Sequence, residues 1–137
     1  PMSVSHFEAG WWSGSAGLPA PVYPGTEFDG RTWDRDAIRE FYTPWREVEA
    51  KGVPVHIGEF GCHNRTPNDV ALRWLTDLIG VFIEFGWGCA LWNFQGPFGI
   101  VSHGRPGAVY EDVQGYPVDR ALLELMRENL AAVKSKA

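Results

Sequence analysis

Residues 53–65 read VPVHIGEFGCHNR, and this stretch decides the fold. Valine and isoleucine favour a buried strand over residues 53–58. That strand leads directly into Glu59, which is flanked by Gly58 and Gly61. Glycine allows sharp turns and leaves space beside the backbone, so a ligand has room to approach there. A carboxylate in this place is a candidate nucleophile or acid/base group, and the alternative is a structural cap or ion pair.

The rest of the chain alternates strand-like and helix-like segments. Apolar residues recur at helical spacing in three segments, and short apolar runs precede them. Asp34 is a plausible N-cap for the first helix, and Pro44 is expected to kink or split it. Thr66 with Pro67 signals the start of the second helix, and Gly86 its end. The strands are predicted at residues 2–7, 53–58 and 88–93, and the helices at 34–51, 67–86 and 119–133.

Strands that alternate with helices predict βαβ units and a parallel sheet. The 137 residues suit a single α/β domain, 1–137, with three consecutive βα units. Two long loops, residues 8–33 and 94–116, each follow a strand and precede a helix. Loops of that kind lie at the carboxyl end of a parallel sheet or barrel, where active sites are found.

Composition excludes several classes of protein. The net charge is −5 with acidic and basic residues interspersed, so no basic cluster indicates nucleic acid. No apolar run is long enough to indicate a membrane span. No metal-ligand spacing or nucleotide-binding glycine motif is present, so we expect no metal and no cofactor. Cys62 and Cys89 are open to either interpretation, one bridge or two free thiols.

Three side chains stand at the predicted strand ends: His6, Glu59 and Trp92. The carboxyl ends of parallel strands share one face, so these side chains are expected to meet there. A carboxylate, an imidazole and a flat ring together are typical of a sugar hydrolase. The seven Trp, eight Phe and four Tyr either form an aromatic core or supply platforms for sugar rings. Further candidate substrate contacts are Trp11, Trp12 and Asn93.

Several stretches resemble the C-terminal portion of glycoside hydrolase family 5, the cellulase-type retaining β-glycanases. In the order of the family's sixth to eighth barrel strands, the matching stretches are VSHF (4–7), VYPG (22–25), GVPVHIGEFG (52–61), GWGCALWNFQGPFGI (86–100) and VYEDVQGYPVDRALLELM (109–126). The resemblance implies a (β/α)8 TIM barrel, of which this chain holds three βα units and is incomplete by itself. It implies that Glu59 is the nucleophile, that His6 lies beside it, and that Trp92 is a platform under the sugar.

The resemblance also implies a second carboxyl group. A retaining mechanism needs an acid/base residue about 5 Å from the nucleophile. In the family this Glu lies in an Asn-Glu-Pro segment of the fourth strand, and the present sequence has no such segment. Glu8, Glu27 and Glu111 are weak substitutes. We therefore expect the chain to be inactive without the other strands.

Two functions remain open from the sequence. The first is retaining hydrolysis of β-1,4-glucan or cello-oligosaccharides, with mannan and mixed-linkage glucan as other substrates. The second is a non-catalytic partial barrel with residual sugar binding. In both cases unpaired strand edges predict a homo-oligomer. The parent family is extracellular or periplasmic, but the opening PMSVSHFEAG has no signal-peptide pattern, so the location of this chain stays unknown.

Overall fold

The computed structural model describes residues 22–134, which form three helices and three pairs of strands. The predicted first strand at residues 2–7 lies outside the described residues, as do His6, Trp11 and Trp12. The elements are β1 (Thr26–Phe28), β2 (Arg31–Trp33), α2 (Arg35–Glu49), β3 (His56–Phe60), α3 (Asn68–Phe85), β4 (Gly88–Leu91), β5 (Tyr110–Val113), β6 (Tyr116–Asp119) and α4 (Arg120–Lys134).

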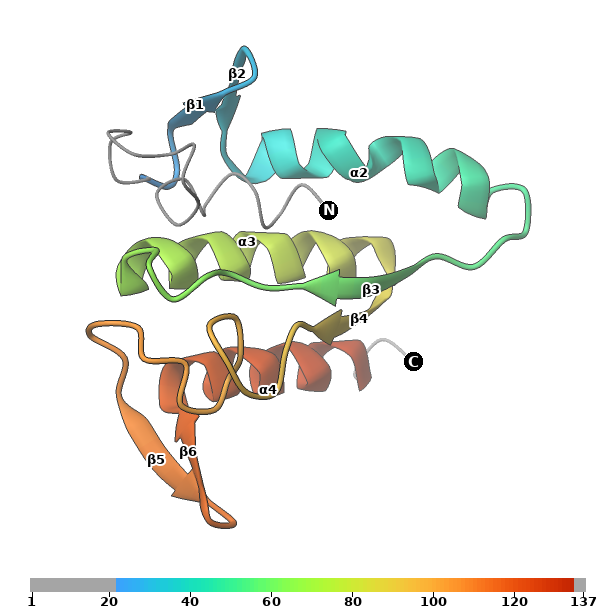
Figure 1. Cartoon of the computed structure of the whole chain (residues 1–137). Helices are drawn as coiled ribbons and strands as arrows, with labels where there is room; N and C mark the ends of the chain where they lie inside the picture. Colours follow the sequence, from blue (N-terminus) through green and yellow to red (C-terminus); the bar gives the residue numbers. More distant parts are fainter. Residues whose placement is uncertain (1–21, 135–137) are drawn as a thin grey trace.

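The centre of the fold is a βαβ unit. Strands β3 and β4 pair in parallel, and α3 makes the crossover between them. Figure 1 shows α2, α3 and α4 side by side as one layer, with the two parallel strands lying against it. This is the α/β arrangement of a barrel wall, as the alternation of strands and helices predicted. Within residues 22–134, no helix combines the length and apolarity needed to cross a membrane.

The apolar stripe of α3 builds most of the core. Its predicted inward residues are all buried: Val70, Trp74, Leu75, Leu78, Ile79 and Phe82. Phe82 meets Phe60 of β3 edge to face, with ring centroids 5.8 Å apart. Aromatic pairs prefer this geometry, and it ties the strand layer to the helix layer. Trp45, in the far half of α2, is exposed.

The pairing of β3 with β4 contains a register shift. Ile57 pairs with Cys89 and Phe60 with Leu91, so two residues of β3 stand opposite one residue of β4. An extra residue of this kind is a β-bulge, which re-aims the neighbouring side chains. All four paired side chains contact the core, although Ile57 and Phe60 are three positions apart. The two residues between them, Gly58 and Glu59, are exposed.

Gly61 brings the ends of the two strands together. A Cβ at this position would collide with the carbonyl oxygen of Trp92. The backbone N–H of Trp92 donates to the carbonyl of Phe60 at 2.7 Å. The sharp turn expected at Gly58 and Gly61 is absent, because the strand continues through Gly58 to Phe60. Gly61 is therefore needed for close approach and not for turning.

Two β-hairpins lie in segments that the sequence predicted as loops. Strands β1 and β2 are joined by Asp29 and Gly30, and β5 and β6 by Gln114 and Gly115. All four joining residues have positive φ, which is the type I′ turn geometry that matches strand twist. The prediction of structureless loops over residues 8–33 and 94–116 is wrong at these two places, although Asp-Gly is a known hairpin signal.

The helix ends follow the sequence signals unevenly. Asp34 caps α2 as predicted, since its carboxylate accepts the backbone N–H of Ala37 at 2.8 Å. The helix runs unbroken through Pro44, so the expected split there is not observed. Thr66 does not cap α3, because the helix begins one residue later and Pro67 occupies the N-cap position. Gly86 ends α3 in the left-handed conformation, as predicted.

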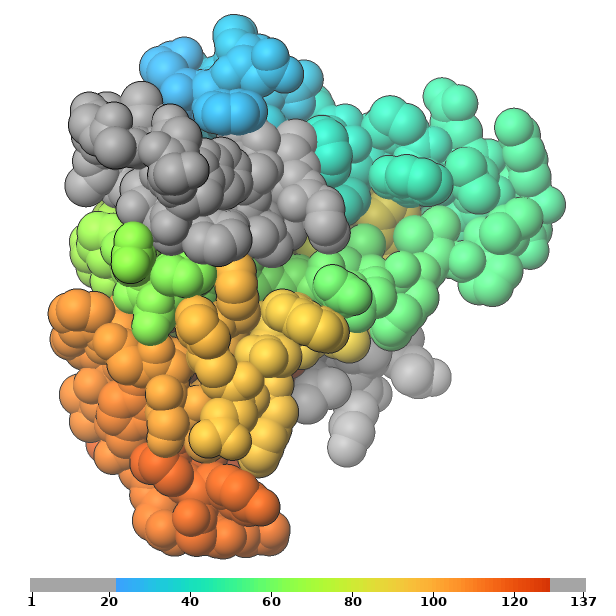
Figure 2. All heavy atoms as spheres, viewed as in Figure 1, coloured from blue at the N-terminus to red at the C-terminus, as the bar shows by residue number. Residues whose placement is uncertain are grey.

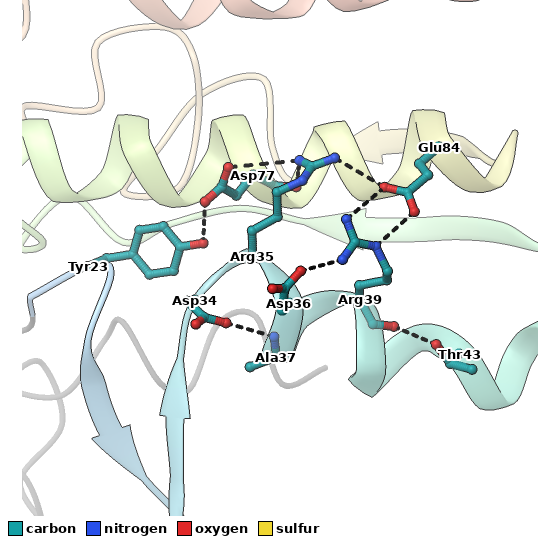
Figure 3. Close-up of polar contacts among 9 residues, drawn as sticks. All are labelled: Tyr23, Asp34, Arg35, Asp36, Ala37, Arg39, Thr43, Asp77 and Glu84. Atoms are coloured by element: carbon teal, nitrogen blue, oxygen red, sulfur yellow. Dashed lines mark hydrogen bonds and ion pairs between the residues drawn. The ribbon is translucent and has the colours of Figure 1, made fainter.

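A polar clasp holds α2 against α3 (Figure 3). Arg39 donates from Nε and Nη2 to the two carboxylate oxygens of Glu84, at 2.8 and 3.2 Å. Arg35 reaches the same carboxylate at 3.2 Å and the carbonyl of Asp77 at 3.3 Å. The hydroxyl of Tyr23 donates to the Asp77 carboxylate at 2.6 Å. These groups are partly exposed, so the clasp orients the helices more than it stabilises them.

A buried polar network fastens the last loop and α4. Nε2 of His103 lies 2.8 Å from Oδ2 of Asp119, and neither side chain reaches solvent. Nδ1 of His103 accepts the backbone N–H of Arg105 at 3.0 Å, so the ring proton is on Nε2. The other oxygen of Asp119 accepts the N–H of Leu122 in the first turn of α4. Arg105 in turn donates to the carbonyl of Cys62 at 2.7 Å.

Opposing effects act on the pKa of Asp119. Burial raises it, but the hydrogen bonds from His103 and from the N–H of Leu122 outweigh burial. The pKa is therefore held below the ordinary range of an aspartate, and the carboxylate stays ionised at neutral pH.

Gly61→Ala is predicted to destabilise the protein by about 1–3 kcal/mol, because the new methyl group overpacks the junction with Trp92. Gly58→Ala is the matched control, since a Cβ at Gly58 meets nothing within 4 Å. Its expected change is within about 0.5 kcal/mol. Urea unfolding followed by tryptophan fluorescence measures both. Equal losses in the two variants would show that the strand ends are not in close contact.

Asp119→Asn is predicted to lower the free energy of unfolding by about 1–3 kcal/mol at pH 7. The contribution of a carboxylate with a depressed pKa is present above its unfolded pKa and is lost as the pH falls through the folded value. The gap between variant and parent should therefore begin to narrow below about pH 5 and continue to narrow as the pH falls through the lowered folded pKa. Asp112→Asn, at an exposed position of β5, is the control. A gap that stays constant with pH would contradict the prediction.

Candidate active site

Glu59 lies in β3, one residue before its end. The register shift turns its side chain away from the core that Ile57 and Phe60 contact, and Glu59 is exposed. The sequence placed Glu59 at or just beyond the strand end, and the observed position is close to that. A free carboxylate on the open face of a parallel sheet, near its carboxyl end, is in the usual place for a catalytic group.

Trp92 directly follows β4 and stands beside the end of β3. The preceding side chain, Leu91, packs against the core, whereas the Trp92 ring is 48% exposed. The hydrogen bond from Trp92 to Phe60 places its backbone next to the residue that follows Glu59. The predicted carboxylate and the predicted platform are thus on adjacent strand ends, and both are exposed.

Asn93 is oriented differently from the prediction of a sugar contact. Its side-chain amide lies against Gly96, within the loop, and its Oδ1 is buried without a hydrogen-bond partner. The peptide bond between Trp92 and Asn93 is cis. The carbonyl of Asn93 accepts the N–H of Ile100 at 3.2 Å. The role of Asn93 in substrate binding stays a prediction.

The three carboxylates considered as substitutes for the missing acid/base residue are Glu8, Glu27 and Glu111. Glu27 accepts a hydrogen bond from Thr32 across the β1–β2 hairpin. Glu111 lies on β5, where its charge acts on Arg120. Glu8 lies outside the described residues, as do His6, Trp11 and Trp12.

An apolar cavity of about 480 Å³ extends along β3 as far as Glu59. Its walls come from the far half of α2 and from the approach to β3. The lining residues are Phe41, Tyr42, Trp45, Val48, Val53, Pro54, Val55, His56, Ile57, Gly58 and Glu59. A lining with so few polar groups suits protein packing better than a sugar, whose hydroxyls need hydrogen-bond partners.

The described residues contain no group of three His, Cys, Asp or Glu side chains that could hold a metal ion. Cys62 is buried, Cys89 is half-buried, and both are free thiols. Burial raises the pKa of the Cys89 thiol, which disfavours the reactive thiolate.

Three supporting residues were missed from the sequence. His103 and Asp119 tie the loop after β4 to α4, and Arg105 ties the same loop to Cys62 in the loop after β3. Asp119 offered a signal, since an aspartate before an apolar helix is a typical cap. No local pattern marks His103 or Arg105, because their partners are distant in the sequence.

Comparisons with known proteins place this geometry in context. No family model matches the chain. Endoglucanase B of Neocallimastix patriciarum is 31% identical over 101 residues, which is 69% of this chain and 20% of that protein. A solved structure described as a glycoside hydrolase is 56% identical with a TM-score of 0.84, and the match covers 94% of this chain and 39% of that one.

More distant structures share the fold alone. Cel5A of Thermotoga maritima, solved with mannotriose, is 21% identical with a TM-score of 0.64 over 91% of this chain and 36% of its own. The present chain therefore spans less than two fifths of the length of each of these relatives. The motifs, the parallel βα arrangement and the matches together show that the chain has the sequence and fold of part of a family 5, endoglucanase-type glycoside hydrolase barrel.

Proposed function

We propose that this chain supplies the nucleophile side of a retaining β-1,4-glucan hydrolase site. One observation supports the proposal: Glu59 is an exposed carboxylate near the carboxyl end of β3, and the exposed Trp92 follows the end of the neighbouring strand β4, where its backbone N–H donates to Phe60. A carboxylate beside a flat ring suits a sugar that is held by stacking and attacked from one side.

In this proposal the Glu59 carboxylate attacks the anomeric carbon, and a covalent glycosyl-enzyme forms as the leaving sugar departs. A second carboxyl group, about 5 Å away, protonates the leaving oxygen and then activates water. That group comes from a strand beyond the present residues, so hydrolysis depends on the completed barrel. Trp92 supports the sugar next to the cleaved bond, and His6 is proposed to hydrogen bond near the nucleophile.

The substrate class follows from the relatives. One is named an endoglucanase, and Cel5A of Thermotoga maritima has been solved with cellobiose and with mannotriose. We therefore propose a β-1,4-glucan as the first substrate and a mannan as the second.

A mechanism-based label tests the nucleophile. An activated 2-deoxy-2-fluoro cellobioside should attach to Glu59, because the fluorine slows release of the glycosyl-enzyme that the mechanism predicts. Peptide mass spectrometry then locates the added mass. In a barrel completed with the missing strands, Glu59→Gln should remove the label and lower hydrolysis of carboxymethyl cellulose by several orders of magnitude. Glu111→Gln should keep both, and a label on any carboxylate other than Glu59 would refute the assignment.

A second candidate function is self-association of a partial barrel. The observation that favours it is the apolar cavity beside β3, with Trp45 and Val53 about half exposed at its walls. Apolar surface of this kind is typical of an interface. Among the described strands, β4 pairs only with β3, so its outer edge is available to a second copy.

Light scattering tests the assembly. The protein should form a dimer or larger species, and Trp45→Glu should weaken that association at least about tenfold, because a charge replaces a large apolar side chain in the contact. Val109→Glu is the matched control, since Val109 is exposed on the loop before β5 and is not part of the cavity lining. A monodisperse monomer of the unmodified protein would rule out self-association.

A further inference from the structure

Three large aromatic side chains are exposed along one loop. The Trp92 ring is 48% exposed, that of Phe94 57% and that of Tyr116 49%. Large apolar side chains are costly to leave in water, and a group of them with polar neighbours commonly marks a binding surface. Only Trp92 is used by the proposed catalytic site, so Phe94 and Tyr116 need a separate explanation.

Phe94 and Tyr116 form a pair. Their ring centroids are 5.2 Å apart and the rings are nearly perpendicular, at 78°. Tyr116 is the first residue of β6 and pairs with Val113 across the hairpin turn. The ring of one residue braces the other, so at least one flat face is held in a fixed direction.

The backbone that carries Phe94 is firmly held. Its carbonyl accepts the N–H groups of Val101 at 2.9 Å and of Ile100 at 3.2 Å. Gly99 packs so closely on this carbonyl that a Cβ there would approach it within 2.8 Å. Val101 bridges to Val118 of β6, which ties the loop to the hairpin. The two rings are therefore presented by a preorganised surface, which reduces the cost of binding.

The pair also lies at the correct end of the fold. Residues 92–119 connect the end of β4 to the start of α4, so they form a βα loop at the active-site face of a barrel. Figure 1 shows the β5–β6 hairpin projecting from the end toward which β3 and β4 run. In Figure 2 the gold and orange segments after β4 form a continuous surface down to the hairpin.

We propose that Phe94 and Tyr116 are a second sugar platform, which binds further units of the glucan chain whose reacting unit rests on Trp92. This inference rests on the proposed function. The neighbouring exposed side chains of Gln95 and Gln114 are neutral amides, which donate to and accept from hydroxyl groups. An uncharged chain of sugars fits such a surface, because its flat apolar faces stack on rings and its hydroxyls meet amides.

Calorimetry with cellobiose and cellohexaose tests the platform. Phe94→Ala and Tyr116→Ala should each weaken cellohexaose binding at least about fivefold and leave cellobiose binding unchanged. Trp92→Ala should weaken the binding of both sugars. Tyr116→Phe keeps the ring and should retain cellohexaose affinity, which separates stacking from loss of folding. Val109→Ala, another exposed position of the same loop, should change neither sugar.

The outcomes separate this inference from the proposed function. If the two alanine variants bind cellohexaose as the parent does, the platform is refuted while the Trp92 site stands. The same holds if cellohexaose binds no tighter than cellobiose. If neither sugar binds and Trp92→Ala has no effect, both the platform and the proposed sugar site are refuted. Equal weakening by Tyr116→Phe and Tyr116→Ala would also overturn the stacking role.

Discussion

The arrangement of this protein depends on one mismatch between two paired strands. Ile57 and Phe60 both have to reach the core beneath the sheet, yet they are separated by an odd number of positions, which a regular strand would send to opposite faces. The extra residue in β3 resolves this conflict. It also turns Glu59 to the open face, so the same irregularity that completes the core exposes the candidate nucleophile.

Three sets of contacts hold the β3–β4 pair and the helices together: the apolar stripe of α3, the Arg39–Glu84 ion pair and the His103–Asp119 pair. Burial of the α3 stripe supplies the main stabilisation, since apolar area removed from water is the dominant favourable contribution. The Arg39–Glu84 clasp orients α2 against α3, and the buried His103–Asp119 pair fastens the loop after β4 to α4. The stabilising apolar contacts thus lie between the sheet and the helices, and the candidate site residues Glu59 and Trp92 are exposed.

Local signals succeeded where a residue acts on its own neighbours. The Asp34 cap, the Gly86 stop and the α3 stripe were all predictable, because caps and helical spacing involve residues a few positions apart. Both hairpins were missed, although Asp29-Gly30 carries a recognisable turn signal. Thr66 failed as a cap by a single position, which is the usual uncertainty of a helix boundary. His103 and Arg105 had no such signal, because their partners are distant in the sequence.

The sequence by itself determined the alternation of strands and helices, the relationship to a glycoside hydrolase and the identity of Glu59 and Trp92 as candidates. Those conclusions rest on periodicity and on motifs, which are local properties of the chain. Only the tertiary structure decided which way the candidates point. The register shift, the need for glycine at position 61 and the pairing of Phe94 with Tyr116 arise when distant segments meet, and no local pattern encodes that meeting.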